Sequence, residues 1–291
     1  MNLSRHSVAI ALTAAIWGGT PHAQKPSLED VLKKGTQYVT AYAPRVSGVT
    51  LDELFLLIEV GGGRMAPPSR ISSDVVLINV NSGLVALRDV YAIDTKPVRT
   101  REPRITSILT NPTVSGWQVA QSYAQQNQIY LRANVIVQVS EPTQVLQFLT
   151  DAMHDKVTYK LEGQKRIDGV QTIALSFKEP TARDKVYVLG TRGNAASSGR
   201  FWLDPATGAV HQTEFWIESP SESARLTTVY ARDTKLDLLL PASMHGTYQW
   251  REASHGPTNM GVGVYNLRQD FEVNVKYSNP TLTPIDLTKI R

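Results

Sequence analysis

The stretch Gly199–Ile217, GRFWLDPATGAVHQTEFWI, constrains the fold of this chain more than any other segment. Two runs rich in aromatic and β-prone residues flank Asp204-Pro205-Ala206-Thr207-Gly208. Proline sets φ to about −65° at an early turn position, and glycine readily adopts the left-handed conformation that closes such a loop. The pattern therefore predicts a β-hairpin, and it favours a twisted antiparallel sheet as the core of the fold.

Alternating apolar residues extend this interpretation to much of the chain. Each strand of this kind has one buried face and one wet face, as expected in an antiparallel sheet. The clearest alternations are Val157-Tyr159-Leu161, Ile173-Leu175-Phe177 and Phe271-Val273-Val275-Tyr277. Earlier strands are expected at Glu53–Val60, Asp74–Val80 and Leu84–Ile93, and a loop is expected at Ala195–Gly199.

Helices are expected in two places. Ser27 and Asp30 have the spacing of a capping box, and apolar residues then recur at three- and four-residue steps as far as Tyr42. Pro44 is expected to end this amphipathic helix. A helical insert is expected near residues 100–154, with segments at Arg101–Thr110, Ser115–Gln128 and Pro142–His154.

The N-terminus has the pattern of an export signal. Arg5 is followed by the ten-residue apolar run Val8–Trp17, which is shorter than the about 20 residues that a membrane-spanning helix needs. Cleavage after Ala23 is predicted, which makes residues 1–23 a signal peptide and residues 24–291 a single domain. A periplasmic or secreted protein is therefore expected. A membrane-tethering or buried helix is the alternative interpretation of the same residues.

Composition narrows the function classes. The chain has no cysteine, which excludes disulfides, Cys-zinc sites and thiol catalysis. The net charge of +4 is small for 291 residues, and no block of five or six like charges occurs. Nucleic-acid binding is therefore not expected. No later apolar run approaches membrane-spanning length, so no transmembrane segment is expected after removal of the signal peptide.

Compact catalytic and metal motifs are absent from the sequence. Gly61-Gly62-Gly63 lacks the lysine and the following helix of a phosphate-binding loop, so a strand connection is expected there. His211 is expected to make a cross-strand hydrogen bond beside Thr213 rather than to bind a metal. The carboxylates Glu214, Glu218, Glu222, Asp233 and Asp237 are expected on solvated faces and turns. No cofactor, no metal and no catalytic residue are predicted.

Aromatic residues suggest a different kind of site. An ordinary packed core is the first interpretation, and an apolar pocket between sheet and helices is the second, since ligand sites are mostly apolar. The residues in question are Trp117, Trp202, Trp216, Trp250, Tyr123, Phe148, Tyr159, Phe201, Phe215 and Phe271.

The hairpin motif resembles one known group of proteins. Trp202, Leu203, Asp204-Pro205, Thr207-Gly208 and Glu214 match the aromatic strand, D-P-x-T-G turn and following glutamate of the LolA-like lipoprotein-carrier superfamily. The resemblance implies an α+β fold, namely a strongly curved antiparallel half-barrel with helices covering its concave face. In that superfamily the space between helices and sheet accepts acyl chains. This chain is longer, by an insert near residues 95–150 and a tail after Tyr277, and no functional residue is carried over.

These observations favour a non-enzymatic exported protein that binds an acyl chain or another apolar ligand, with a role in lipoprotein or lipid handling. The candidate pocket residues face inward on alternating strands: Tyr159, Leu161, Phe271 and Val273. Two alternatives stay open. One is an exported hydrolase with a dispersed site that uses His154, His211 or His245, and the other is an envelope module that binds another protein.

Overall fold

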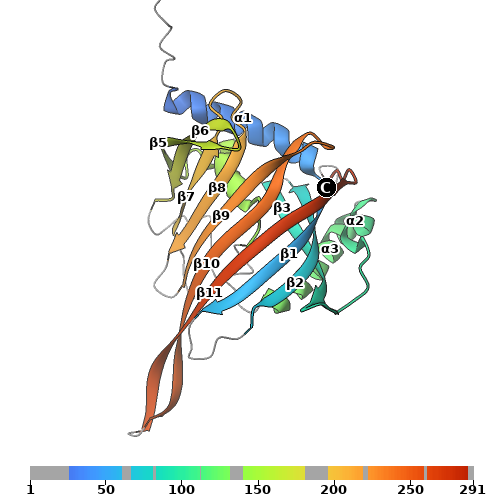
Figure 1. Cartoon of the computed structure of the whole chain (residues 1–291), viewed down its shortest axis with the longest axis vertical. Helices are drawn as coiled ribbons and strands as arrows, with labels where there is room; N and C mark the ends of the chain where they lie inside the picture. The colour runs from blue at the N-terminus through green and yellow to red at the C-terminus, as the bar shows by residue number, and fades with distance from the viewer. Residues whose placement is uncertain are drawn as a thin grey trace, which may run out of the picture.

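The structure is a computed structural model, and it describes residues 26–60, 67–80, 83–111, 113–131, 140–180, 196–218, 222–258 and 261–287. Its centre is one antiparallel sheet of 11 strands in the order β4-β3-β2-β1-β11-β10-β9-β8-β7-β6-β5 (Figure 1). The strands are β1 Val49–Val60, β2 Ser69–Val80, β3 Gly83–Ile93, β4 Lys96–Pro97, β5 Thr158–Ile167, β6 Val170–Lys178, β7 Ala196–Leu203, β8 Val210–Glu218, β9 Glu222–Asp233, β10 Leu238–Thr258 and β11 Gly261–Leu282. The expected α+β class with a curved antiparallel sheet is therefore confirmed.

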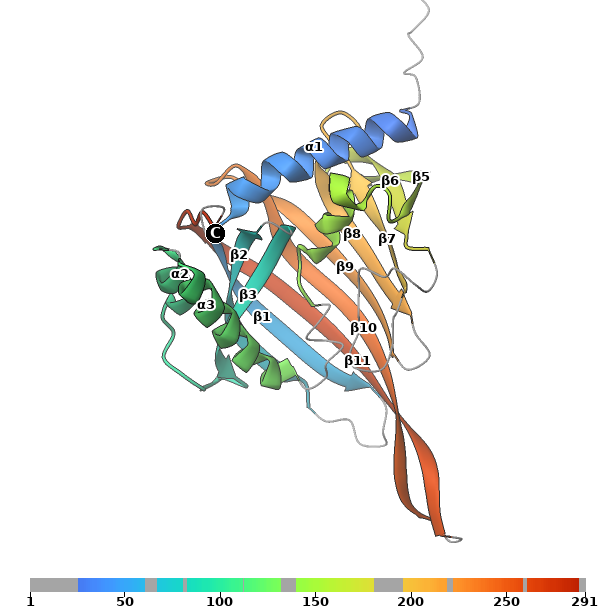
Figure 2. The same ribbon diagram turned by 180° about the vertical axis from the view of Figure 1, so that it is seen from behind.

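Helix α1, Leu28–Val46, crosses one end of the sheet (Figure 2). The Ser27 hydroxyl accepts a hydrogen bond from the Asp30 backbone N–H, as the capping motif predicts. The expected end at Pro44 is wrong, because the helix continues to Val46 with the proline inside it. Val46 is fully buried, and the stability gained by its packing offsets the hydrogen bond that the proline removes.

The predicted hairpin is β7–β8, and its turn contacts α1. Asp204 organises the turn through its carboxylate, which accepts hydrogen bonds from the Ala206 N–H and the Thr207 hydroxyl. Gly208 has φ +76°, and the Lys34 ammonium donates a hydrogen bond to the Pro205 carbonyl at 2.8 Å. The motif thus joins the sheet to the first helix.

The expected loop at Ala195–Gly199 is wrong over its described residues, which begin β7. Ser197 pairs with Ile217, and Gly199 pairs with both Phe215 and Phe177. A Cβ atom on Gly199 would lie 2.6 Å from the Phe177 ring. The small residues therefore do not indicate a loop here, because they make room for an aromatic ring on the neighbouring strand.

Segment 140–154 lies inside the curve of the sheet, and we refer to it as the plug (Figure 2). It contains the 3₁₀ turns η2, Gln144–Leu149, and η3, Asp151–Met153, so the expected α-helix is wrong in type. The Leu146 N–H bonds to the Thr143 carbonyl, because the Pro142 carbonyl accepts instead from the Tyr230 hydroxyl. Tertiary contacts thus replace the helical hydrogen bonds.

Helices α2, Arg104–Leu109, and α3, Val114–Gln126, pack elsewhere, and α3 continues into the 3₁₀ turn η1, Asn127–Leu131. Along β2 the residues Val75 and Leu77 belong to the core shared with α1, whereas Val76 and Ile78 belong to a second core with α2 and α3. Because neighbouring strand residues point to opposite faces, this part of the insert covers the other face of the sheet.

Two predictions fall on residues that the structure leaves undescribed. The signal peptide at 1–23 and the strand connection at Gly61–Gly63 both lie outside the described residues.

Candidate functional site

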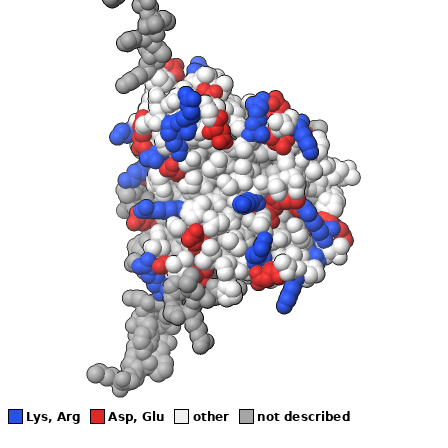
Figure 3. Space-filling view, viewed as in Figure 1, with Lys and Arg blue, Asp and Glu red and all other residues white. Residues whose placement is uncertain are grey.

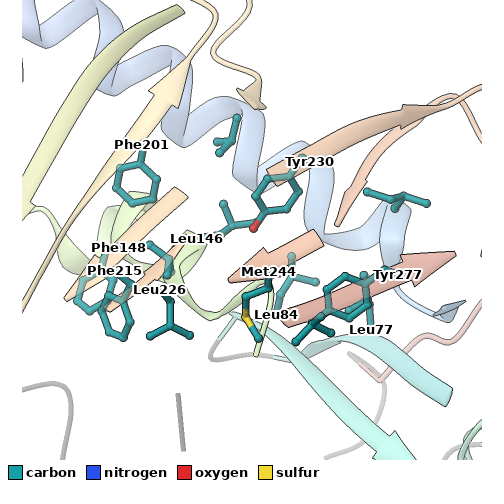
Figure 4. Close-up of a cluster of buried hydrophobic side chains, with 14 of the residues drawn as sticks. Leu77, Leu84, Leu146, Phe148, Phe201, Phe215, Leu226, Tyr230, Met244 and Tyr277 are labelled. Atoms are coloured by element: carbon teal, nitrogen blue, oxygen red, sulfur yellow. The ribbon is translucent and has the colours of Figure 1, made fainter. Parts of the chain in front are cut away.

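The hollow of the curved sheet is occupied by side chains of the plug (Figure 4). The Phe148 ring stacks on Phe177 with centroids 4.4 Å apart and lies 5.9 Å from Phe215, while Phe201 lies 5.2 Å from Phe177. Leu146, Phe148 and Leu149 are 0–1% exposed. Three of the aromatic residues considered for a pocket, Phe148, Phe201 and Phe215, therefore form packed core.

Three tyrosine hydroxyls from the sheet bind the plug. Tyr230 of β9 donates to the Pro142 carbonyl at 2.6 Å, and Tyr159 of β5 donates to the Phe148 carbonyl. The hydroxyls of Tyr248 of β10 and Ser140 lie 2.8 Å apart. Burial raises the pKa of each of these tyrosines, so all three stay protonated and able to donate at neutral pH.

The four predicted pocket residues all join the main core. Phe271 and Val273 of β11 are 5% and 0% exposed, while Tyr159 and Leu161 of β5 are partly buried against the same cluster. Five strands, β10, β9, β8, β7 and β6, lie between the two pairs, because β5 ends the sheet and β11 lies in its middle. The sheet therefore presents them on one connected core, but not as one local group.

An open groove follows α1 on the side where it meets the plug. Its first part, about 600 Å³, lies between the N-terminal half of α1 and η3. Its second part, about 380 Å³, lies between α1, η2 and the ends of β2 and β3. Thr40 lines both parts, and Thr150 and Asp151 are neighbours that line one each. The α1 residues involved run from Glu29 to Ala43, which is about 21 Å at the helical rise.

The two parts of the groove differ in chemistry. The second part is mainly aliphatic: Val39, Ala43, Val80, Leu84, Leu146 and Ala152. The first part carries Glu29, Lys33, Asp151 and His154 around Leu32 and Ala41. The two parts therefore differ in the charge of their lining residues, which the first part has and the second lacks among the described residues.

A hydroxyl and an imidazole meet in the first part of the groove. The Thr36 hydroxyl lies 3.0 Å from His154 Nε2, and His154 Nδ1 lies 3.9 Å from the Asp151 carboxylate. Thr36 is buried and Asp151 is exposed. His154 is one of the three histidines considered for a hydrolase, and it lines this cavity next to the Thr36 hydroxyl.

The other two histidines have different surroundings. His211 is 8% exposed, and burial lowers the pKa of its imidazole, against the opposing field of Asp204 and Asp168. His245 is exposed, and its Nδ1 lies 3.0 Å from the Asn274 side-chain oxygen. Among the described residues no group of three histidine, aspartate or glutamate side chains is arranged to hold a metal ion.

A buried ion pair lies on the plug side of the sheet, and the sequence analysis missed it. Arg88 of β3 donates from Nε and Nη2 to the two carboxylate oxygens of Glu53 of β1, at 2.5 and 2.7 Å. Ser73 of β2 donates to the same carboxylate at 2.5 Å. The Glu53 side chain is fully buried. The sequence did contain a signal for this ion pair: Glu53 is a charged residue at an inward position of the otherwise apolar strand ELFLLIEV.

Glu141, at the start of the plug, adds a second carboxylate near Arg88. One of its oxygens lies 3.4 Å from the Ala86 backbone N–H on the outer edge of β3. Burial raises the pKa of Glu141 to about 6, against the lowering effects of that N–H and of Arg88. The Asn127 side chain makes hydrogen bonds with the backbone further along β3. It accepts a hydrogen bond from the Val90 N–H and donates one to the Arg88 carbonyl.

On the other face of the sheet, a row of aspartates is balanced by nearby arginines. Asp52, Asp74 and Asp89 are direct cross-strand neighbours on β1, β2 and β3, an arrangement that would be repulsive without counter-ions. Arg101 pairs with both Asp52 and Asp74, and Arg104 lies 3.4 Å from Asp89. The space-filling view shows basic and acidic side chains beside one another (Figure 3).

Glu214, expected on a solvated face, lies in a half-buried network on that same outer face. It accepts hydrogen bonds from Arg200 at 2.9 Å and from the Trp202 indole at 2.7 Å. The Arg200 guanidinium also lies 5.4 Å from the Trp216 ring centroid. Trp202 and Trp216 therefore point away from the plug, and Trp117 packs on the second core, so these three do not line the hollow.

Within the part of the chain that the structure describes, none of the helices has the length and apolar character needed to cross a membrane.

The sequence matches no protein-family model and no curated protein. Similar solved structures include a putative outer membrane lipoprotein-sorting protein domain from Vibrio parahaemolyticus, at 12% identity and TM-score 0.39, covering 90% of this chain and 94% of that chain. A DUF1329 family protein from Desulfovibrio piger matches at 10% identity and TM-score 0.34, covering 89% and 95%. A LolA superfamily protein from Nitrosomonas europaea matches at 10% identity and TM-score 0.31, covering 89% and 94%.

Proposed function

We propose that this chain is a non-enzymatic exported protein that binds an acyl chain or another apolar chain in the groove between α1 and the plug. The observation that carries the proposal is the aliphatic second part of that groove, formed by Val39, Ala43, Val80, Leu84 and Ala152. Each methylene removed from water in such a site contributes about 0.8 kcal/mol. Export rests on the pattern of residues 1–23.

Tyr159, Leu161, Phe271 and Val273 belong to the same proposal as a deeper site. They lie in the core that the plug covers, and Tyr159 itself holds the plug by its hydrogen bond to Phe148. A ligand would contact them after displacing the plug side chains from the sheet. The groove and the deeper site therefore make separate predictions about which substitutions block binding.

Fluorescent fatty-acid binding to the purified mature protein tests the proposal. Ala43→Trp places a large ring in the groove at a partly exposed helix position, and we expect at least a tenfold loss of affinity. Val119→Trp adds the same ring to α3 at a 53% exposed position outside the groove, and it should bind like the parent protein. Equal binding by both variants would contradict the groove assignment.

The deeper site has its own test. Val273→Asp places a charge in the core, and it is expected to abolish fatty-acid binding if the acyl chain of the ligand reaches β11. A folded Val273→Asp protein with parental affinity would exclude the deeper site and leave the groove as the binding surface.

An exported hydrolase is the second candidate, and the 3.0 Å contact of the Thr36 hydroxyl with His154 Nε2 favours it. Hydrolysis of p-nitrophenyl butyrate by the parent protein, lost in both Thr36→Val and His154→Ala, would support this function. No turnover above that of His154→Ala would exclude it.

A further inference from the structure

A second, smaller cavity opens beside the outer edge of β3, apart from the groove described above. Its volume is about 180 Å³, which suits a small molecule of a few non-hydrogen atoms. Strand β3 contributes Arg88, α3 contributes Trp117, Gln121 and Gln125, and the plug contributes Glu141. The cavity is thus lined by residues of three parts of the fold: β3, α3 with η1, and the plug.

The charges that the described residues place around this cavity do not balance. The Arg88 guanidinium is held by both oxygens of Glu53, at 2.5 and 2.7 Å, and its Nη2 also donates to the Ser140 carbonyl at 3.1 Å. That pair is neutral by itself. Glu141 then adds a carboxylate whose described hydrogen bond is the weak contact with the Ala86 N–H at 3.4 Å. Within the described part of the chain, the cluster therefore holds the two acids Glu53 and Glu141 and the one base Arg88.

The surroundings of Glu141 disfavour its ionised form because they exclude water. Burial raises its pKa to about 6, even though Arg88 lies close enough to oppose that change. Among the described residues, Arg88 is the cation that acts on Glu141, and Glu53 already holds it, so the partly buried Glu141 carboxylate favours either a proton or a further cation. An anionic ligand would add to the imbalance, so a cation is the complementary class.

The remaining walls fit an organic cation better than a bare metal ion. Gln121 and Gln125 supply amide oxygens that accept hydrogen bonds from an ammonium group. Trp117 and Leu131 also line the cavity, the first with an aromatic ring of the kind that attracts cations and the second with an apolar side chain that suits an alkyl portion. A single carboxylate with neutral amides is also too few charged ligands for a divalent metal.

We propose that this cavity binds the primary ammonium group of a small organic amine, with the Glu141 carboxylate as its counter-ion. The ammonium donates to Glu141 and to the α3 amides, and the carbon chain rests against the apolar wall. Free amines and lipid headgroups such as ethanolamine carry this same group.

The first test is calorimetric titration of the full mature protein with ethylamine, ethanolamine and 1,5-diaminopentane at pH 7.5. Saturable binding is expected, with neutral N-acetylethylamine at least tenfold weaker. Glu141→Gln keeps an oxygen for the Ala86 N–H but removes the charge, and it should lose at least tenfold in affinity. Asp155→Asn removes the same charge from an exposed position directly after the plug and should bind like the parent protein.

Parental affinity in folded Glu141→Gln, or equal binding of amine and acetylated amine, would overturn the proposal. So would the absence of binding to every amine and vesicle tested. The melting temperature of Glu141→Gln confirms that the variant is folded. Arg88, Glu53, Tyr248 and Tyr277 belong to or border the same cluster, so the pH dependence of binding is measured as the difference between the parent and Glu141→Gln.

A second arm distinguishes the sources of the amine. Vesicles containing phosphatidylethanolamine are compared with vesicles of phosphatidylcholine, whose headgroup has no N–H. Glu141-dependent binding to the first alone identifies a lipid headgroup, and binding to free amines alone identifies a soluble ligand. Both results support the ammonium site. Ala43 lines the groove and not this cavity, so Ala43→Trp should leave amine binding unchanged. Failure of the groove proposal and failure of the ammonium proposal are therefore distinguishable.

Discussion

The Lys34 backbone carbonyl lies directly over Gly208, so that a Cβ atom on the glycine would be 2.2 Å from the carbonyl oxygen. Gly208 also has φ +76°, a conformation that side chains other than glycine rarely adopt. The turn that the sequence marks most clearly is therefore the place where α1 rests on the sheet.

Gly208→Ala is expected to destabilise the protein strongly. The left-handed backbone alone costs about 1–2 kcal/mol for alanine, and the overlap with Lys34 forces α1 away from the turn. Gly169→Ala isolates the first effect, because Gly169 has φ +81° and open space around its Cβ position. Urea denaturation should show a clearly larger loss of unfolding free energy for Gly208→Ala, and equal losses would contradict the α1 contact.

Tyr230→Phe is expected to weaken attachment of the plug. The Pro142 carbonyl would lose its hydrogen bond in a buried site, which costs about 1–3 kcal/mol. Tyr277→Phe is the comparison variant, because the Tyr277 hydroxyl is buried near the Glu53 carboxylate and has no partner in hydrogen-bond geometry among the described residues. Thermal denaturation should lower the melting temperature of the first variant only, whereas equal effects would show that Tyr230 acts by packing alone.

Arg88→Met should be among the most destabilising substitutions in the chain. It leaves the Glu53 carboxylate buried without a cation, and breaking such a pair costs about 3–5 kcal/mol. The double variant Glu53→Leu with Arg88→Met should recover most of that loss. Arg232→Ala breaks an ion pair whose side chains are 64% and 67% exposed, and it should change stability by about 0–1 kcal/mol. No recovery in the double variant would argue against an isolated charge as the cause.

Glu141→Gln should change the pH dependence of stability. The pKa of Glu141 is raised to about 6 in the folded protein, so its contribution to stability is fully present below pH about 4.5 and is lost as the pH rises through about 6. Since one pKa unit corresponds to about 1.4 kcal/mol, the loss is about 2 kcal/mol at pH 7.5. The variant should therefore lack this decline in denaturation curves between pH 4.5 and 7.5. An unchanged pH profile would show that Glu141 does not ionise in this range.

Much of the fold was predictable from local patterns. The capping residues at Ser27 and Asp30 determine where α1 begins, and the alternation at Phe271–Tyr277 identifies an inward face of β11. Such signals depend on a few neighbouring residues, and the structure confirms them. The inward residues Tyr159, Leu161, Phe271 and Val273 lie in the main core for the same reason, while their role in binding stays a prediction.

The predictions that are wrong depend on distant contacts. Pro44 lies within α1 because Val46 is buried in the core, and residues 196–199 form a strand because Phe177 and β8 lie beside them. Segment 142–154 has the apolar stripe of an α-helix, yet the tyrosine hydroxyls of β5 and β9 donate hydrogen bonds to its carbonyl groups. Its observed form is set by its place inside the sheet.

The sequence by itself determined the antiparallel class, the first helix, the hairpin turn and the inward faces of the strands, because caps, turns and alternation act over a few residues. Only the tertiary structure decided that the plug fills the hollow, that the open groove lies along α1, and that Glu53, Arg88 and Glu141 form one charged cluster. Residues 53, 88 and 141 are far apart in the chain, and only the pairing of β1, β2 and β3 together with the docking of the plug brings their charges together.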